Sequence, residues 1–388
     1  MPTFAHLPNF YALPVQFSPA IWLLLVSVLV QLGYAAYYFL PFALRPQAPA
    51  PADAQLDAEP VSILVCAHNE LDNLRQLLPL LLQQEYPAGF EIILVDDRSG
   101  DDTYLYVQQL TQYYPNVRLV TVDKTPEGLS PKKYALTLGI KVARYPRLLF
   151  TDADCIPATN QWVRLMQRGF SRPADVILGY SAYAEAPGFL NKLIRFETLL
   201  TGAQYLSFAW RGQPYMGVGR NLAYTQQCFH ATKGFASHIR SLGGDDDLFV
   251  QDAVRHGQRV TVEAEPAAHT LSVPAKTWAV WWRQKRRHLS AGQRYRLADR
   301  LRIGNFIGTN LLFYFTTLVL LISRPDWVPL TALWGIRTVV ICATYAKLGQ
   351  RLDNRLPTVL LPVLDAVYFF YYLALGISLF LYRNLRWK

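Results

Sequence analysis

Two aspartates separated by one residue, Asp152 and Asp154, end an apolar run that begins at Arg147. Side chains at positions i and i+2 of an extended segment point the same way, so both carboxylates could face one site just beyond the strand. Oxygen ligands of this kind favour Mg²⁺ or Mn²⁺, which neutralise the charge of a departing diphosphate. The alternative is a solvated turn that binds nothing.

Polar side chains also follow two other apolar runs. The run at 61–67 ends in His68, Asn69 and Glu70, and the run from Phe90 ends in Asp96 and Asp97. Both runs are typical of buried parallel strands, and each is followed by a helical pattern, at 71–85 and 102–114. This alternation predicts an α/β fold with a doubly wound sheet. Ligands of such sheets lie outside the carboxyl ends of the strands, so one cleft could collect these side chains with the aspartate pair.

A second acidic cluster, Asp245 to Asp247, follows two glycines and opens a helical segment that runs to His256. A carboxylate here could take the proton from a hydroxyl acceptor. Adjacent acids raise one another's proton affinity, and a helix amino terminus partly offsets this effect. The choice of base stays open between Asp245 and Asp246. The alternative is a helix cap made of three acids, without chemistry.

The segment 278–289 combines tryptophans with basic residues and contains Gln284, Arg287 and His288. A guanidinium group suits bidentate binding of a diphosphate. The same pattern is typical of an amphipathic helix that anchors to lipid headgroups. Both roles are compatible, because a helix can lie on the membrane and also cover a site.

The composition favours a membrane protein. Of 388 residues, 52% are hydrophobic and 17% are charged. Four segments are apolar and long enough to cross a bilayer: 21–40, 303–323, 327–346 and 356–382. Arg337 and Asp365 interrupt the last two and could pair inside the membrane. Residues 45–60 form a semi-rigid Pro/Ala linker.

The distribution of basic residues predicts the orientation. No Lys or Arg precedes Arg45, whereas a dense basic run at 283–302 lies directly before the second span, so the domain between them should be cytoplasmic. Four spans would, however, put the basic tail at 383–388 on the far side. A last segment that is re-entrant or interfacial would remove this conflict, and the sequence leaves the choice open.

The net charge of +10 does not indicate a nucleic-acid partner, because no nucleic-acid-binding motif is present. The basic residues crowd next to the membrane segments, where they could contact anionic lipid or the phosphate of a lipid-linked acceptor. The four cysteines are scattered, with no Cys-x-x-Cys pair, which predicts neither a zinc site nor a disulfide framework.

In their order these motifs resemble those of the family-two inverting glycosyltransferases of the GT-A fold, over roughly residues 61–300. The resemblance implies a GT-A mixed sheet and a nucleoside-diphosphate sugar donor, UDP- or GDP-linked. It implies that Mn²⁺ or Mg²⁺ binds Asp154 and Asp152, with Asp154 the favoured ligand. The implied donor-binding residues are His68, Asn69, Glu70, Asp97, Lys132 and Asp152, with Lys132 on the diphosphate. Glu70 and Asp97 could instead be helix-start caps.

The resemblance also implies roles for residues in the second half of the chain. It places the catalytic base in the acidic cluster, but the family's Glu-Asp pair falls on Gly244 and Asp245, so the expected glutamate is missing. Gln284, Arg287 and His288 resemble the Gln-x-x-Arg-Trp motif of processive synthases on the acceptor and diphosphate side, with His in place of Trp. A segment similar to 216–224 shapes the sugar pocket, which makes Arg220 and Asn221 candidates; the alternative is a glycine-rich strand bend.

We therefore expect a multi-pass membrane enzyme of the bacterial inner-membrane type, an inverting glycosyltransferase that moves a sugar onto a lipid-linked or glycan acceptor. The expected domains are an anchor (1–44), the linker (45–60), a cytoplasmic GT-A catalytic domain (61–272), an amphipathic interfacial segment (273–302) and a transmembrane region (303–388). Two other interpretations stay open. One is a processive polysaccharide synthase, and the other is a catalytically silent partner that binds nucleotide or lipid in an export complex.

Overall fold

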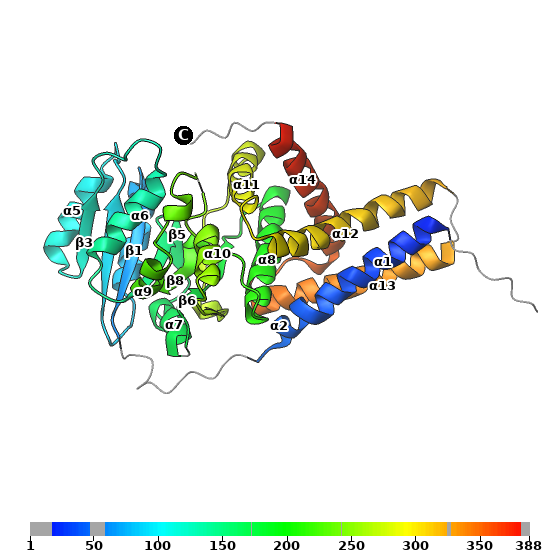
Figure 1. Ribbon diagram of the computed structural model, residues 1–388, viewed down its shortest axis with the longest axis horizontal. Coiled ribbons are helices and arrows are strands. Elements are labelled where there is room, and N and C mark those ends of the chain that lie inside the picture. Colours follow the sequence, from blue (N-terminus) through cyan, green and yellow to red (C-terminus); the bar gives the residue numbers. More distant parts are fainter. Residues whose placement is uncertain (1–17, 47–58, 172, 242, 324–326, 382–388) are drawn as a thin grey trace, which may run out of the picture.

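The computed structural model describes residues 18–46, 59–171, 173–241, 243–323 and 327–381. An α/β domain lies at one end of these residues and long helices lie at the other (Figure 1). Most of the predicted linker and the basic tail at 383–388 fall outside the described residues.

The larger sheet has seven strands in the order β3-β2-β1-β4-β8-β6-β9. Strands β3, β2, β1 and β4 are parallel to one another, whereas β8 runs antiparallel to β4 and β6. A smaller sheet has the order β5-β10-β7. The bounds are β1 Val61–Ala67, β2 Phe90–Asp96, β3 Val117–Thr121, β4 Arg147–Asp152, β5 Cys155–Pro157, β6 Val176–Leu178, β7 Ser181–Tyr183, β8 Leu222–Thr225, β9 Val260–Val262 and β10 Thr270–Ser272.

Helices pack on both faces of the larger sheet, which is why its central strands are largely apolar, with buried Ser62 and Glu91 as exceptions. Ile63 and Val65 of β1 belong to one core cluster, and Leu64 between them belongs to another on the opposite face. The helices of this domain are α4 Leu71–Leu82, α5 Thr103–Tyr113, α6 Pro131–Val142, α7 Trp162–Arg168, α9 Gln226–Ala231 and α10 Asp247–Arg255. Short 3-10 turns are η2 Gly169–Ser171, η3 Gly219–Asn221, η4 Ala236–His238, η5 Pro266–Ala268 and η6 Thr358–Leu360.

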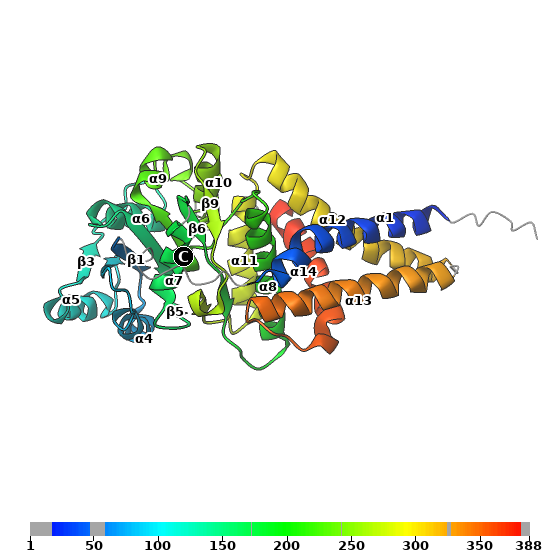
Figure 2. The ribbon, with the colours of Figure 1, turned by 90° about the horizontal axis from the view of Figure 1, so that it is seen from below.

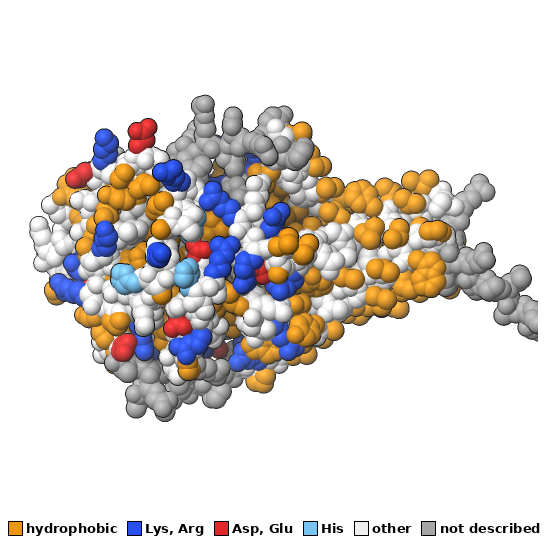
Figure 3. Space-filling model, viewed as in Figure 1, with side chains coloured by type: hydrophobic (Ala, Val, Ile, Leu, Met, Phe, Trp, Pro, Cys, Tyr) orange, Lys and Arg blue, Asp and Glu red, His pale blue; other side chains and the backbone are white. Residues whose placement is uncertain are grey.

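Three long helices run side by side away from the α/β domain (Figures 1 and 2). They are α1 Pro19–Tyr34, which continues through a π-helix, η1 Ala35–Phe39, into α2 Leu40–Leu44, then α12 Leu297–Ile322 and α13 Trp327–Arg351. We call them the arm. Apolar side chains cover the visible face of the arm, and Lys and Arg gather where it meets the α/β domain (Figure 3).

Three further helices lie between the α/β domain and the arm and run across the direction of the arm in both views (Figures 1 and 2). They are α8 Phe189–Trp210, α11 Trp278–Gly292 and α14 Leu361–Leu381, and we call them the transverse layer. α14 contacts both α8 and α11. Together with the arm, α14 makes four helices that are long and apolar enough to cross a membrane, in agreement with the number of hydrophobic segments in the sequence.

The two charges expected inside the membrane do pair. Arg337 on α13 forms an ion pair with Asp365 on α14, and both side chains are buried. The guanidinium also donates to Gln31 Oε1 on α1 and to Asn310 Oδ1 on α12, each at 2.7 Å. Tyr345 Oη donates to the second oxygen of Asp365 at 3.0 Å. One buried network therefore joins all four long helices.

We expect replacement of Arg337 by Met to destabilise the helical part by about 3–5 kcal/mol, because it leaves the carboxylate of Asp365 buried without its charge partner. Unfolding of the full chain in nanodiscs measures this cost. The double variant Arg337→Met/Asp365→Leu should recover most of the loss, and Arg300→Met, at an exposed position on α12, should be neutral. A double variant as unstable as the single one would contradict the assignment of the cost to the unpaired charge.

Candidate active site

The aspartate pair converges at the carboxyl end of β4, as its spacing predicts. Asp152 ends the strand, and Asp154 lies in the turn before β5. Ligand atoms of Asp152, Asp154 and Cys155 lie within 4.8 Å of one another. Burial and the two carboxylates raise the pKa of the Cys155 thiol well above its ordinary value, so the thiol stays protonated. What remains is a pair of carboxylates, a donor set that suits a hard divalent cation.

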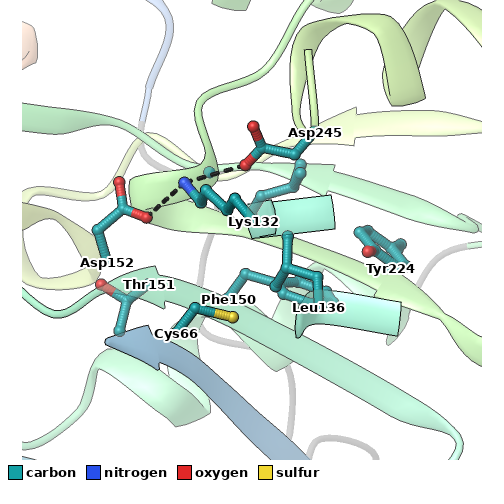
Figure 4. Close-up of a pocket in the computed structure, with 10 residues that line it drawn as sticks. Cys66, Lys132, Leu136, Phe150, Thr151, Asp152, Tyr224 and Asp245 are labelled. Atoms are coloured by element: carbon teal, nitrogen blue, oxygen red, sulfur yellow. Dashed lines mark hydrogen bonds and ion pairs between the residues drawn. The ribbon is translucent and has the colours of Figure 1, made fainter. Parts of the chain in front are cut away.

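Lys132 connects this pair to the second acidic cluster. The helix α6 begins at Pro131, and the next residue sends its Nζ to 2.9 Å from Asp152 Oδ1 and 3.0 Å from Asp245 Oδ2 (Figure 4). Burial alone would lower the pKa of Lys132, but Asp152, Asp245 and Asp246 outweigh it and raise the pKa well above its ordinary value. Lys132 is therefore a permanent cation between two groups of carboxylates.

A pocket opens around Lys132, with a charged rim and a mostly apolar floor (Figure 4). The register of the sheet explains its place, because Cys66 at the end of β1 pairs with Asp152 at the end of β4. Its lining residues are Cys66, Lys132, Leu136, Phe150, Thr151, Asp152, Gly219, Leu222, Tyr224 and Asp245.

The structure separates the two candidate bases. Burial would raise the pKa of Asp245, but the ammonium of Lys132 holds it below the ordinary value, so Asp245 is ionised in the pocket. Burial and the neighbouring Asp245 raise the pKa of Asp246. Both oxygens of Asp246 accept backbone hydrogen bonds at 2.8 Å, one from Asp247 N at the start of α10 and one from Gly219 N. Asp246 is thus a helix cap that also holds the η3 turn.

The predicted donor-binding residues of β1 and the loop after β2 lie together. His68 Nδ1 lies 2.6 Å from the carbonyl of Asp97, and Asn69 Oδ1 accepts from Gly100 N at 2.7 Å. Asp97 is not at a helix start, and Glu70, which precedes α4, makes no side-chain cap bond. The alternative assignment as a helix cap is therefore wrong for Asp97, whereas Glu70 occupies the N-cap position of α4 without a capping hydrogen bond. Burial, with help from Asp154 and Asp152, raises the pKa of Glu70, so Glu70 shares the field of the aspartate pair.

Arg220, on η3, lies between the aspartate pair and α11. Its Cζ lies 4.6 Å from the centre of the Tyr183 ring, and Gln284 Nε2 donates to the hydroxyl of Tyr183 at 3.1 Å. Burial would lower the pKa of Arg220, but Tyr183, Cys155 and Asp152 outweigh burial and raise the pKa above its ordinary value. Nη1 of Arg220 is buried without a hydrogen-bond partner among the described residues. A buried unpaired N–H costs about 1–3 kcal/mol, so this atom indicates a place for a ligand.

The other residues of α11 lie at the edge of the same site. The carbonyl of Arg287 is 4.0 Å from where a Cβ on Gly243 would lie, which puts α11 beside the loop that leads to the acidic cluster. His288 is exposed. Asn221, the other candidate of the η3 turn, is instead structural. It is fully buried and bonds Trp162 Nε1 and the carbonyls of Tyr180 and Ala268.

Comparison with known proteins identifies the domain that holds this site. The family model described as Glycosyl transferase family 2 matches residues 62–237, a stretch that runs from β1 past β8 and includes Lys132 and the aspartate pair. The chain contains a glycosyl transferase family 2 domain. The predicted resemblance to family-two glycosyltransferases is thereby confirmed for these residues.

One curated relative is named a probable glycosyltransferase, and another is named a synthase of an amino-sugar polymer. The chain is 28% identical over 241 residues to the probable glycosyltransferase YdaM of Bacillus subtilis, covering 60% of this chain and 55% of YdaM. It is 24% identical over 247 residues to the poly-beta-1,6-N-acetyl-D-glucosamine synthase of Staphylococcus epidermidis, covering 62% of this chain and 56% of that synthase. The chain thus spans about half the length of these relatives.

A solved structure shares the fold over most of both chains. The mannosyltransferase PcManGT from Pyrobaculum calidifontis, in complex with GDP-Man and Mn²⁺, superposes with a TM-score of 0.57 at 15% identity. The alignment covers 91% of this chain and 99% of that one. The similarity extends beyond the family 2 domain and confirms the predicted α/β fold with a mixed sheet.

The structure shows why a glycine stands at position 244, where the sequence resemblance predicts a glutamate before Asp245. Gly244 has a φ of +89°, in the left-handed region that favours glycine. A Cβ at this position would also lie 2.4 Å from Leu248 Cδ1. The sharp turn into α10 therefore excludes a glutamate here unless the backbone changes.

One site-supporting residue was not predicted from the sequence. Lys133 is completely buried, and its Nζ donates to the carbonyls of His238 and Gly243 at 2.7 Å and to Ser241 Oγ at 2.6 Å. These acceptors belong to the loop that precedes Asp245. No motif marks Lys133, because its role depends on a loop that lies more than a hundred residues further along the chain.

We expect Lys133→Met to destabilise the family 2 domain by about 2–4 kcal/mol, because it leaves buried oxygens without a donor. The loop before Asp245 should also become accessible to hydrogen exchange. Lys141→Met, at an exposed position at the other end of α6, is the matched control. Normal protection of residues 238–244 in Lys133→Met would show that the ammonium does not hold this loop.

Proposed function

We propose that the protein is a membrane-bound inverting glycosyltransferase that moves a sugar from a nucleoside-diphosphate donor to a hydroxyl of a lipid-linked or glycan acceptor. The observation that carries this proposal is Lys132 Nζ, which lies within 3.0 Å of both Asp152 and Asp245. Asp152, which would lie on the donor side, and Asp245, which would lie on the acceptor side, thus both contact the ammonium of Lys132 in the pocket. Inverting transfer needs a base on the acceptor side and a stabilised leaving group on the opposite side of the anomeric carbon, and these two carboxylates could serve the two sides.

On the donor side, Asp154 and Asp152 would hold Mg²⁺ or Mn²⁺. When bound, this ion would offset the charge of the leaving diphosphate. The presence of Mn²⁺ with GDP-Man in PcManGT supports the proposal. The nucleoside would lie over the strand ends at His68–Glu70 and Asp97, where the backbone turns of the two loops are already fixed by their mutual hydrogen bonds.

Three cations of the chain would bind the diphosphate: Lys132, Arg220 and Arg287. Lys132 would exchange part of its contact with Asp152 for a phosphate oxygen. The unpaired Nη1 of Arg220 would gain an acceptor, which removes the cost of burying it alone. Gln284 supports Arg220 indirectly, since it fixes the Tyr183 ring on which the guanidinium stacks.

On the acceptor side, Asp245 would be the general base. The acceptor oxygen attacks the anomeric carbon while the bond from that carbon to the diphosphate oxygen breaks, and the hydroxyl proton passes to Asp245. The lowered pKa of Asp245 supports this choice, because the carboxylate is ionised before the reaction. As Lys132 turns to the diphosphate, Asp245 loses part of its partner and becomes a stronger base.

The place of the site supports a membrane-associated acceptor. The helix α11 lies beside the loop that leads to Asp245 and belongs to the transverse layer next to the arm. The arm and α14 contain the helices that are long and apolar enough to cross a membrane. We propose that the family 2 domain faces the cytoplasm, where the basic run at 283–302 would lie. The length of the product, resolved on a gel, distinguishes a single transfer from polymerisation.

The test is release of nucleoside diphosphate by the purified protein in nanodiscs, with a panel of UDP- and GDP-sugars, Mn²⁺ or Mg²⁺ and lipid extract. We expect release from at least one donor, and losses of at least about a hundredfold in Asp154→Asn and in Asp245→Asn. Donor binding should survive in Asp245→Asn, because the change affects the acceptor side. Asp72→Asn, at a position that is 93% exposed on α4, should keep full activity.

Each variant can contradict a separate part of the proposal. Full activity of Asp245→Asn would move the base to another residue. Full activity of Asp154→Asn in the presence of a chelator would remove the metal from the mechanism. No release from any donor by folded protein would favour the silent-partner interpretation.

For Arg220 we expect Arg220→Gln to weaken binding of the free nucleoside diphosphate about tenfold or more, because one charge-assisted hydrogen bond contributes about 1.5–3 kcal/mol. Calorimetry with UDP and GDP measures the effect without turnover. Arg220→Lys should recover part of the affinity, since it keeps the charge but not the second donor. Arg255→Gln, on the exposed side of α10, serves as control. Unchanged affinity in Arg220→Gln would exclude Arg220 from the diphosphate site.

A further inference from the structure

The direction of α14 differs from that of the other three helices that are long enough to cross a membrane. α1, α12 and α13 run along the long axis of the molecule, and α14 runs across that axis in both views (Figures 1 and 2). If the arm crosses the bilayer, α14 lies close to the membrane plane. Its length alone does not decide the matter, because an apolar helix of 21 residues can span a bilayer.

Packing fixes α14 in this direction. Tyr371 stacks on Trp281 of α11, with ring centres 6.5 Å apart. Tyr372 Oη donates to Glu197 Oε1 on α8 at 2.8 Å, and Lys285 Nζ of α11 lies 2.6 Å from the other oxygen of Glu197. Glu197 and Lys285 are buried, so this ion pair joins the three helices of the transverse layer. Removing α14 from the layer would leave Glu197 without one of its donors.

The outer face of α14 is apolar along its whole length. Val363, Phe370 and Ile377 are 50%, 43% and 51% exposed and follow one another at intervals of seven residues. Since a helix has 3.6 residues per turn, these side chains form a single stripe. A stripe of this kind on a helix that lies across the arm fits acyl chains just below the headgroups. Trp278 of α11, which is 49% exposed, extends the apolar surface with a residue typical of the membrane interface.

We propose that α14 is an interfacial helix that rests in the leaflet next to the family 2 domain, and that only α1, α12 and α13 cross the bilayer. With three crossings the chain ends on the same side as the family 2 domain. The basic tail Arg383, Arg386 and Lys388 then joins the basic run at 283–302 on one side of the membrane. This topology removes the conflict that four crossings create, in which the basic tail lies on the side of the membrane opposite to the basic run at 283–302.

The depth of the exposed stripe tests this topology directly. Nitroxide labels at Val363→Cys, Phe370→Cys and Ile377→Cys, each in a full-length chain whose four native cysteines are replaced, are placed in nanodiscs. Power saturation with oxygen and a polar nickel chelate gives each label's depth. The outer two positions are about 21 Å apart along the helix axis. An interfacial α14 predicts depths that differ by only a small part of that distance, with Val363, close to Asp365, the deepest, whereas a spanning α14 predicts depths that differ by most of it.

The arm supplies a matched control on the same molecule. Val328 and Val339 of α13 are 76% and 68% exposed and lie about 16 Å apart along their helix, so their labels should differ strongly in depth. If the cysteine-free protein does not fold, a protease site added after Lys388 gives the answer in the native chain. Cleavage in sealed vesicles from the side of the family 2 domain supports the proposal, and cleavage from the side of Ser323 overturns it. Neither readout depends on glycosyl transfer.

Discussion

The constraint on which the site depends is the repulsion among carboxylates that the fold collects at one edge of the sheet. Asp152 and Asp154 arrive from the end of β4, and Asp245 and Asp246 arrive from the start of α10. Burial and Asp152 raise the pKa of Asp154, as burial and Asp245 do for Asp246. Lys132 offsets the repulsion from the middle. A ligand that carries a cation as well as negative charge, such as the proposed metal-bound donor, would replace the ammonium without leaving a carboxylate unpaired.

The backbone around these charges is held by elements that take no part in the chemistry. The four-oxygen environment of Lys133, the cap formed by Asp246 and the left-handed Gly244 together fix the entry to α10. The cap also reaches Gly219, so the position of Asp245 and the position of Arg220 are set by one side chain. In the proposed mechanism, the base Asp245 and the diphosphate-binding cation Arg220 would thus be positioned together, as simultaneous attack and departure require.

Much of this arrangement could be predicted from the sequence, because strand ends, helix starts and apolar periodicity are local signals. The strand-end residues 68–70, 97, 152 and 154 all reach the same edge, and the four long apolar helices are present. The role of Asp246 as a cap could not be separated from that of Asp245, since the difference depends on the direction of two adjacent side chains. Arg220 was a candidate, but its unpaired Nη1 is visible only when Tyr183 and α11 are in place. The direction of a helix relative to the membrane also cannot be predicted from hydropathy, because a hydropathy pattern gives the length of an apolar segment but not its orientation.

The transverse layer connects the chemistry to the membrane. Gln284 and Lys285 are neighbours on α11, and they point to different partners: Gln284 bonds Tyr183 beneath Arg220, whereas Lys285 pairs with Glu197 in the layer. A rotation of α11 would disturb both contacts at once. The buried ion pair with Glu197 therefore fixes α11 against α8 and α14. The packing of these helices would therefore set the distance between Asp245 and the membrane surface. An acceptor attached to lipid would present its hydroxyl at a fixed distance from the bilayer, so this arrangement would favour a membrane-bound acceptor over a soluble one.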